Sequence, residues 1–91
     1  MRLDKFLKVS RIVKRRTVAN DMCSAGRVEV NGRPGKPGTT VKVGDVLDIG
    51  YGKSRVKVKI LDVREHVRKE EAESLYEVLE SEGVAKPNKL D

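Results

Sequence analysis

The chain has 91 residues and carries 20 lysine and arginine residues against 14 aspartate and glutamate residues, a formal net charge of +6 at pH 7. This length fits one small domain and leaves little room for a catalytic domain beside it. The single cysteine excludes an internal disulfide, no apolar run is long enough to cross a bilayer, and the start lacks the apolar region of a signal peptide, so we expect a soluble cytoplasmic protein.

Two short amphipathic helices are predicted at the start of the chain. In each, the apolar residues recur at the spacing that places them on one helix face. They are Leu3, Phe6 and Leu7 in the first helix and Ala19, Met22 and Cys23 in the second. The first helix is expected to end near Ser10, and Gly26 supplies the left-handed conformation that ends the second.

A basic turn precedes the second helix. Lys14, Arg15 and Arg16 fall at the helix start, where unpaired amides already form the positive end of the helix dipole. Three cations there are unfavourable unless an anion binds, and a bound phosphate would reverse the sign of the effect. We therefore interpret the turn as a phosphate-binding site. The alternatives are a solvated basic turn and a short localisation signal.

Three later stretches alternate apolar and polar residues, which is typical of strands with one buried face. Asn31-Gly32 is a strong turn signal, the Gly- and Pro-rich run 33–40 predicts a loop, and a glycine turn at 41–45 leads into the second stretch. A further turn is expected at 51–53. The three predicted strands are 27–30, 46–49 and 55–63, and they indicate a small antiparallel sheet.

A helix is predicted over residues 69–82, because apolar residues recur there at helical spacing and Gly83 can end the helix. These residues are Ala72, Leu75, Tyr76, Val78 and Leu79. Six glutamates make the segment a poor RNA contact. Two interpretations stay open for it, a solvated helix and a helix that faces a protein partner. Residues 84–91 are polar and predict a flexible tail.

The net charge is concentrated in the first third of the chain. Residues 1–33 hold nine bases and three acids, whereas residues 34–91 hold equal numbers of each. This asymmetry indicates a polyanionic partner, either a nucleic acid or an anionic membrane. Aromatic residues are scarce, which favours recognition of folded RNA by charge and shape over base stacking. The candidate RNA-binding residues are Arg2, Lys5, Lys8, Arg11, Lys14, Arg15, Arg16, Arg27 and Asn31.

Other chemistry is poorly supported. Gly52-Lys53-Ser54 resembles the end of a phosphate loop, but the earlier glycine is missing at Leu47 and a strand follows instead of a helix. His66 and Cys23 are each the only residue of their type and lie on different elements, so we expect no metal site and no nucleophile with its base. Asp4, beside two cations, is expected to orient an arginine or to begin the helix.

Two short helices, a basic turn and the pattern Gly-x-Val-x-Val-Asn-Gly resemble the alpha-L RNA-binding motif, the module of ribosomal protein S-four. Arg15 departs from it, since that position more often holds a small hydroxyl residue. The residues that match are Arg2-Leu3-Asp4-Lys5-Phe6-Leu7, Arg11, Arg16, Ala19, Gly26, Val28, Val30, Asn31, Gly32 and Val43-Gly44-Asp45. The resemblance implies an α+β fold in which two short N-terminal helices pack on a small antiparallel sheet, with a C-terminal helix added.

The run Lys8 to Thr17 and the chain length make the sequence similar to the bacterial ribosome-associated quality control protein P family and to its relative, the small heat-shock ribosome-binding protein. This resemblance extends to about Leu79. It implies binding to the large ribosomal subunit that carries a stalled peptidyl-tRNA, stabilisation of that tRNA, and support of a partner protein that adds alanine tails. Arg2, Arg11 and Arg16 would then contact ribosomal RNA or tRNA, with Lys5 and Lys8 nearby.

The expected organisation is an RNA-binding domain at 1–64, a C-terminal helix at 65–83 and a tail at 84–91. We expect a non-enzymatic, ribosome-associated protein that is monomeric off the ribosome, with no cofactor, metal ion or membrane partner. Two alternatives use the same surface: an RNA-binding regulator, and a factor of ribosome assembly or heat-shock ribosome recycling. An RNA-modifying enzyme or a synthetase is possible only if the chain is a fragment.

Overall fold

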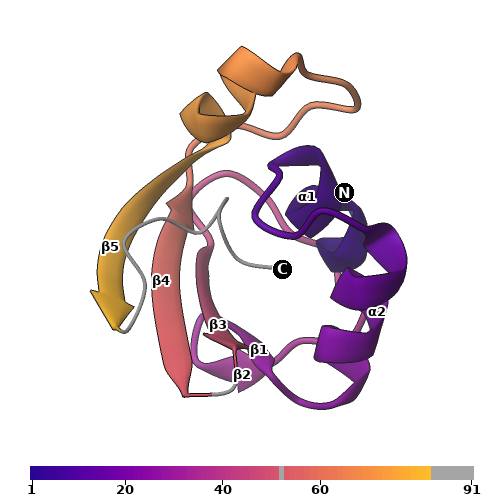
Figure 1. The fold of residues 1–91 in the computed structure, drawn as a ribbon, viewed down its shortest axis with the longest axis vertical. Coiled ribbons are helices and arrows are strands. Elements are labelled where there is room, and N and C mark those ends of the chain that lie inside the picture. Colours follow the sequence, from indigo (N-terminus) through magenta and orange to yellow (C-terminus); the bar gives the residue numbers. More distant parts are fainter. Residues whose placement is uncertain (52, 83–91) are drawn as a thin grey trace.

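One antiparallel sheet organises the fold. The structure, a computed structural model, describes residues 1–51 and 53–82, and in these residues five strands pair in the order β2-β1-β3-β4-β5 (Figure 1). The strands are β1 (Val28–Val30), β2 (Arg33–Pro34), β3 (Val46–Tyr51), β4 (Ser54–Ile60) and β5 (Tyr76–Glu82). The helices are α1 (Leu3–Val9), α2 (Arg16–Ser24) and the 3-10 helix η1 (Lys69–Leu75). The predicted α+β fold, with two short N-terminal helices packed on a small antiparallel sheet, is confirmed.

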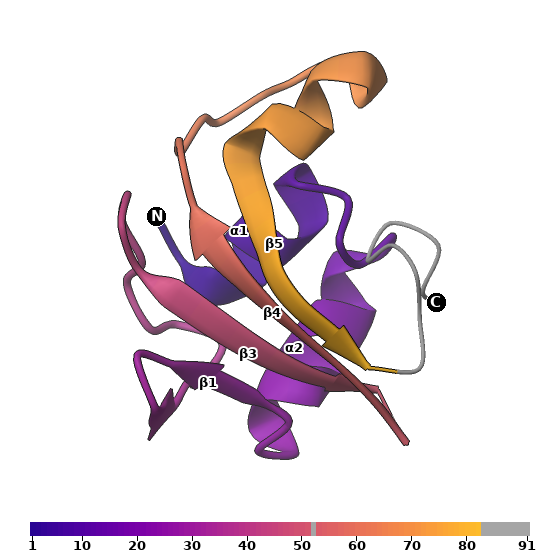
Figure 2. The ribbon, with the colours of Figure 1, turned by 90° about the vertical axis from the view of Figure 1, so that its left-hand side faces the viewer.

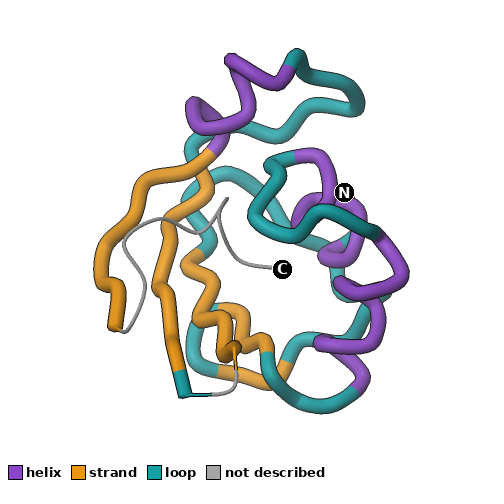
Figure 3. The backbone as a smooth tube through the Cα atoms, viewed as in Figure 1, coloured by secondary structure: helices purple, strands orange, loops and turns teal. Residues whose placement is uncertain are grey.

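The core lies between the two α-helices and one face of the sheet. Figure 2 looks onto the other face, with α1 and α2 behind the strands, and Figure 3 shows the helices and strands as separate layers. Alternate residues of paired strands point to the same face, so the apolar positions of β3 and β4 converge on the helices. The buried side chains that meet there include Leu3, Phe6 and Leu7 of α1, Leu47 and Ile49 of β3, and Val56 and Val58 of β4.

The first residues of the chain are fixed before α1 begins. Arg2 forms a β-bridge with Thr40, the Leu3 amide donates to the Thr39 carbonyl at 2.8 Å, and the Val41 amide donates to the Met1 carbonyl at 2.8 Å. The loop before β3 therefore holds the backbone of Arg2 in place.

The turn between β1 and β2 has the conformation that its sequence predicts. Asn31 has φ 52° and Gly32 has φ 81°, and Val30 pairs directly with Arg33 across a two-residue loop. Two successive residues with positive φ are what such a tight hairpin needs, and Asn-Gly supplies them at low cost. The run 33–40, expected to be a loop, begins with the short strand β2.

The predicted C-terminal helix is wrong at residues 65–68, which are not helical, and at residues 76–82. The 3-10 helix η1 covers residues 69–75, and residues 76–82 form β5, an edge strand antiparallel to β4. Gly83, the expected helix end, and the expected tail at 84–91 lie outside the residues that the structure describes. β4 is also shorter than predicted and ends at Ile60.

Residues 76–82 form a strand because they pair with β4, and the spacing of apolar residues in the sequence cannot reveal such a pairing. Three glutamates of β5 face bases of β4 across a register shift between Lys57 and Val58, with Glu77 opposite Lys59, Glu80 opposite Lys57 and Glu82 opposite Arg55. Opposite charges directly across a ladder stabilise the pairing. Tyr76 also pairs with Ile60, and both side chains are buried. The acidic segment therefore covers basic residues of its own sheet.

Candidate nucleic-acid interface

Two arginines from different elements share one buried carboxylate. Asp4 lies in the first turn of α1 and is 2% exposed. Arg2 donates to it from Nε at 3.2 Å and from Nη2 at 3.4 Å, and Arg16, the first residue of α2, donates from Nε and Nη2 at 3.4 Å each. The Lys5 amide also donates to Asp4 Oδ1 at 2.8 Å. The expectation that Asp4 orients an arginine is confirmed, and it orients two. We call Arg2, Asp4 and Arg16 the arginine pair site.

The charge of Asp4 is maintained although the side chain is buried. Burial alone would raise the pKa of this carboxyl, but hydrogen bonds from Arg16 and Arg2, together with their positive charges, hold it below its ordinary value. The arginine side chains remain about half exposed, at 55% for Arg2 and 48% for Arg16. Because each guanidinium has five N–H donors, both can still donate to an external phosphate.

The start of α2 presents further positive charge. Arg15 is the N-cap residue and makes no side-chain capping bond, and the first turn of α2 contains no acidic residue. Lys14, Arg15 and Arg16 are all exposed, as is Thr17. Free amides, the helix dipole and three cations therefore meet at one surface, which is a suitable site for an anion.

The turn between α1 and α2 is anchored from inside. Ile12 and Val13 are fully buried, and the Val13 amide donates to the Leu7 carbonyl at 3.1 Å. Arg11 and Lys14, on either side of them, are exposed, and Arg11 has φ 61°. A backbone of this kind is uncommon for a residue other than glycine. The buried pair thus holds two cations outward on a rigid turn.

The other predicted residues are more scattered. Lys5 is half-buried and forms an ion pair with Glu65, and Lys8 is half-buried on the same helix. Arg27 is exposed but follows the C-terminal end of α2, away from Arg16. Asn31 donates from Nδ2 to Asp45 at 3.1 Å and accepts from the Val46 amide at 2.9 Å.

Asn31 therefore uses both ends of its amide group to hold the start of β3. This structural role does not test RNA binding, which stays a prediction for Asn31 as for the other eight residues. The arginine pair site brings Arg2 and Arg16 together, and the turn presents Arg11 and Lys14. Arg27 and Asn31 lie on other elements.

Sequence reasoning missed the neighbours of the arginine pair site. A pocket beside it is lined by Asp4, Arg16, Thr17, Asn20 and Asp21. Asn20 could have been identified from the helical period, because it follows Arg16 by four residues on α2. Thr17 follows Arg16 by one residue, and the helical period does not indicate it. The hydroxyl group of Thr17 and the amide group of Asn20 add neutral hydrogen-bonding capacity next to the two guanidinium groups.

The described residues contain neither a metal-binding cluster nor a membrane-spanning helix. Across residues 1–51 and 53–82, no three or more His, Cys, Asp or Glu side chains are grouped so that they could hold a metal ion, and no helix is long and apolar enough to cross a membrane. Burial, with a smaller contribution from the charge of Asp4, raises the pKa of the Cys23 thiol to about 11. Cys23 therefore packs as a core residue, as expected, and is a poor nucleophile.

Comparison with known proteins agrees with this geometry. Residues 1–47 match the S4 domain family. The chain is 57% identical over 86 residues to an RQC P-site tRNA stabilizing factor of Halalkalibacterium halodurans, covering 94% of this chain and 98% of that protein. It is 44% identical to the Bacillus subtilis protein of the same description, covering 90% and 95%. The trimeric structure of Vibrio cholerae heat shock protein 15 aligns with a TM-score of 0.80 at 32% identity, covering 86% of this chain and 80% of that chain.

Proposed function

The chain belongs to the S4-domain family of RQC P-site tRNA stabilizing factors, and on this premise we propose that it binds ribosomal RNA and P-site tRNA in ribosome quality control. In this process it binds the large subunit that carries a stalled peptidyl-tRNA, holds that tRNA in place, and supports the partner that adds alanine tails. It acts in the cytoplasm, without catalysis, and is a monomer off the ribosome.

The arginine pair site is the observation that carries this proposal. Asp4 neutralises one of two positive charges and fixes the direction of both guanidinium groups, so their free donors are presented together before RNA arrives. Preorganised donors lose less conformational entropy on binding than flexible ones. A phosphodiester group between the two arginines would also lie close to the start of α2. Such contacts fit recognition of an RNA backbone by shape and charge.

The test is association of purified protein with large subunits that carry peptidyl-tRNA. We expect Arg2→Ala and Arg16→Ala each to weaken association by about tenfold or more, since each removes a charge-assisted contact. Lys59→Ala is the matched control, because Lys59 is an exposed cation on the outer face of the sheet. Association that survives in both arginine variants, with folding intact by circular dichroism, would overturn the proposed surface.

A second experiment tests whether the tRNA contributes to binding, by comparing large subunits with and without peptidyl-tRNA. A factor that stabilises P-site tRNA should bind large subunits with peptidyl-tRNA more tightly than empty ones, and should slow release of that tRNA. Equal binding to both would favour a general ribosome-binding role. That second candidate predicts that alanine tailing does not depend on this protein.

A further inference from the structure

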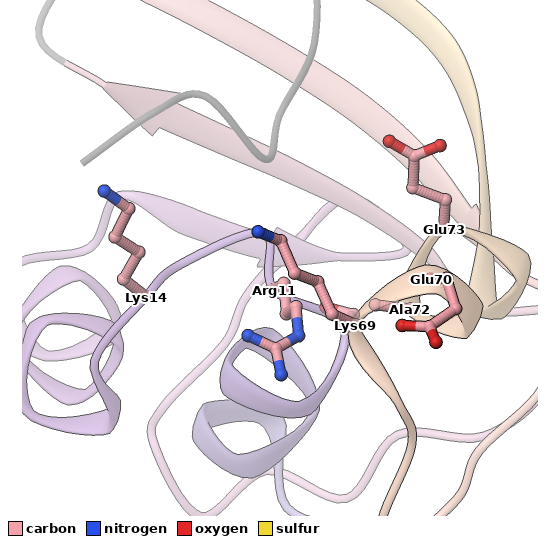
Figure 4. Close-up of a pocket in the computed structure, with 7 residues that line it drawn as sticks. Arg11, Lys14, Lys69, Glu70, Ala72 and Glu73 are labelled. Carbon is pink, nitrogen blue, oxygen red and sulfur yellow. The ribbon is translucent and has the colours of Figure 1, made fainter.

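A pocket lies between the α1–α2 turn and the 3-10 helix η1. Its volume is about 690 Å³, and it is lined by Arg11 and Lys14 from the turn and by Lys69, Glu70 and Ala72 from η1 (Figure 4). This volume falls within the range of about 300–1,000 Å³ that is usual for small-ligand sites. Residues 1–47 match the S4 domain, so the pocket joins that domain to the part of the chain that follows it.

The charges in the pocket are arranged unevenly. Figure 4 shows Arg11 and Lys69 near the centre, Lys14 on one side of them and the carboxylates of Glu70 and Glu73 on the other. Three cations therefore occupy the part toward the turn. Ala72 borders the pocket but is 1% exposed, so charged side chains provide the surface that a ligand can reach. A ligand that fits this arrangement is anionic at one end and has hydrogen-bond donors at the other.

Arg11 follows Ser10, the C-cap residue of α1, and has the left-handed backbone conformation with which helices commonly end. Its φ of 61° is uncommon for a residue other than glycine, asparagine or aspartate, and the Arg11 amide donates to the Lys8 carbonyl at 3.0 Å. Glycine would satisfy the turn better, and arginine at this position supplies a side chain that lines the pocket.

We infer that this pocket binds one unstacked nucleotide of the RNA, with its phosphate on Arg11, Lys14 and Lys69 and its base on the side of Glu70 and Glu73. The inference rests on the proposed function, because it assumes that the arginine pair site brings RNA to this side of the molecule. It adds a second contact, which uses residues from η1 as well as the basic turn.

The position of Glu70 gives the pocket a base preference. A carboxylate accepts hydrogen bonds and cannot donate them, so it favours a base edge with adjacent N–H donors. Guanine offers two such donors on its Watson–Crick edge, whereas uracil presents two carbonyl acceptors around one N–H. The pocket should therefore take guanosine in preference to uridine.

The first experiment titrates the ¹⁵N-labelled full-length chain with the 5′-phosphorylated trinucleotides pUGU and pUUU. We expect amide shifts in the turn and in η1, and at least about fivefold tighter binding of pUGU, the lower end of what a bidentate contact to a base supplies. Shifts confined to the arginine pair site would overturn the pocket. Equal binding of the two probes would overturn the base contact.

Variants separate the phosphate contact from the base contact. Lys69→Ala should weaken both trinucleotides by about three- to tenfold through loss of one phosphate contact, whereas Lys59→Ala should change neither. Glu70→Gln should remove the preference for pUGU and strengthen pUUU binding, because it removes a negative charge. Unchanged preference in Glu70→Gln would refute the role of Glu70.

Failure of this inference is distinguishable from failure of the proposed function. If Arg16→Ala abolishes association with the large subunit while the trinucleotides do not shift the pocket, only the pocket is wrong. If association with the large subunit does not need Arg2 or Arg16, the proposed function loses its support, whatever the trinucleotides do.

Discussion

Asp4 is the residue on which the RNA-binding geometry depends. Its carboxylate is 2% exposed and accepts from Arg2, from Arg16 and from the Lys5 amide. Asp4→Asn would keep the shape but leave two guanidinium groups close together without a counter-charge. We expect a loss of about 1–3 kcal/mol in the free energy of unfolding at pH 7, measured by urea denaturation.

The Asp4→Asn substitution also distinguishes the orienting effect of Asp4 on the two arginines from its effect on net charge. Asp4→Asn raises the net charge by one, so attraction to RNA by charge alone would strengthen binding. If Asp4 acts by orienting Arg2 and Arg16, binding should weaken in spite of the added positive charge. Tighter binding in the variant would show that the two arginines need no positioning.

The pH dependence of stability follows from the low pKa of Asp4. The pKa is lower in the folded state than the value of about 3.9 in an unfolded chain, so the folded state binds the proton less readily. This contribution to stability is therefore fully present above about pH 4 and is lost as pH falls through the folded pKa. The stability difference between the native chain and Asp4→Asn should shrink below pH 4, as urea unfolding at several pH values would show.

Arg11 provides a case in which stability and binding should change in opposite directions. At φ 61° glycine is unstrained, so we expect Arg11→Gly to raise the free energy of unfolding by about 0.5–1 kcal/mol while RNA binding weakens. Arg11→Ala is the matched control, since alanine keeps the strain and loses the guanidinium. It should weaken binding equally and leave stability nearly unchanged. Thermal unfolding beside RNA titration measures both effects.

The contact of the loop before β3 with α1 depends on a glycine. A Cβ at Gly35 would lie 2.6 Å from Leu3 Cδ2 and 3.0 Å from Val30 Cγ2, and Leu3 is fully buried and has no room to move. We expect Gly35→Ala to cost about 1–3 kcal/mol of unfolding free energy, the usual range for overpacking. Gly38→Ala in the same loop meets only the Arg2 guanidinium at 4.0 Å and should be nearly neutral. Equal melting temperatures for the two variants would contradict the close contact.

At the scale of elements, short-range signals in the sequence were sufficient for the N-terminal half. Gly26, with φ 76°, ends α2 as predicted, and Asn31-Gly32 forms the predicted turn. These signals work because the backbone conformation depends on neighbouring residues. The residues Tyr76 to Glu82 show the opposite case, since their strand is stabilised by partners on β4 some twenty residues earlier. Tertiary pairing overrides a helical period there.

The candidate interface was predictable in its residue types and only partly in its geometry. The cluster of bases pointed to the turn and to the start of α2. The contact of Arg16 with Asp4, twelve positions earlier, needs the packing of α1 on α2, which the sequence does not show. Lys69 lines the pocket beside the α1–α2 turn only because η1 lies next to that turn, and the sequence alone did not reveal this position of η1. The burial of Ile12 and Val13 was likewise missed, because they interrupt a basic run.

Across the whole molecule, charge is divided between the two layers. The helical side presents the arginine pair site and the basic turn, whereas on the sheet the bases of β4 face acids of neighbouring strands, with Arg55 bonded to Asp48 at 2.6 Å and Lys57 3.9 Å from Glu80. RNA should therefore approach from the helices, and the outer face of the sheet should contribute little to its attraction.

The salt dependence of binding tests this division quantitatively. Each cation that neutralises a phosphate contributes about 0.7–0.9 to the slope of log K against log salt concentration, because it releases condensed counterions. Removing Arg2 and Arg16 together should therefore lower the magnitude of the slope by about 1.4–1.8. Lys57→Ala with Lys59→Ala removes the same charge from the sheet and should leave the slope unchanged. If both pairs lowered it equally, RNA would be attracted by net charge alone, and the placement of the cations on the helical side would not matter.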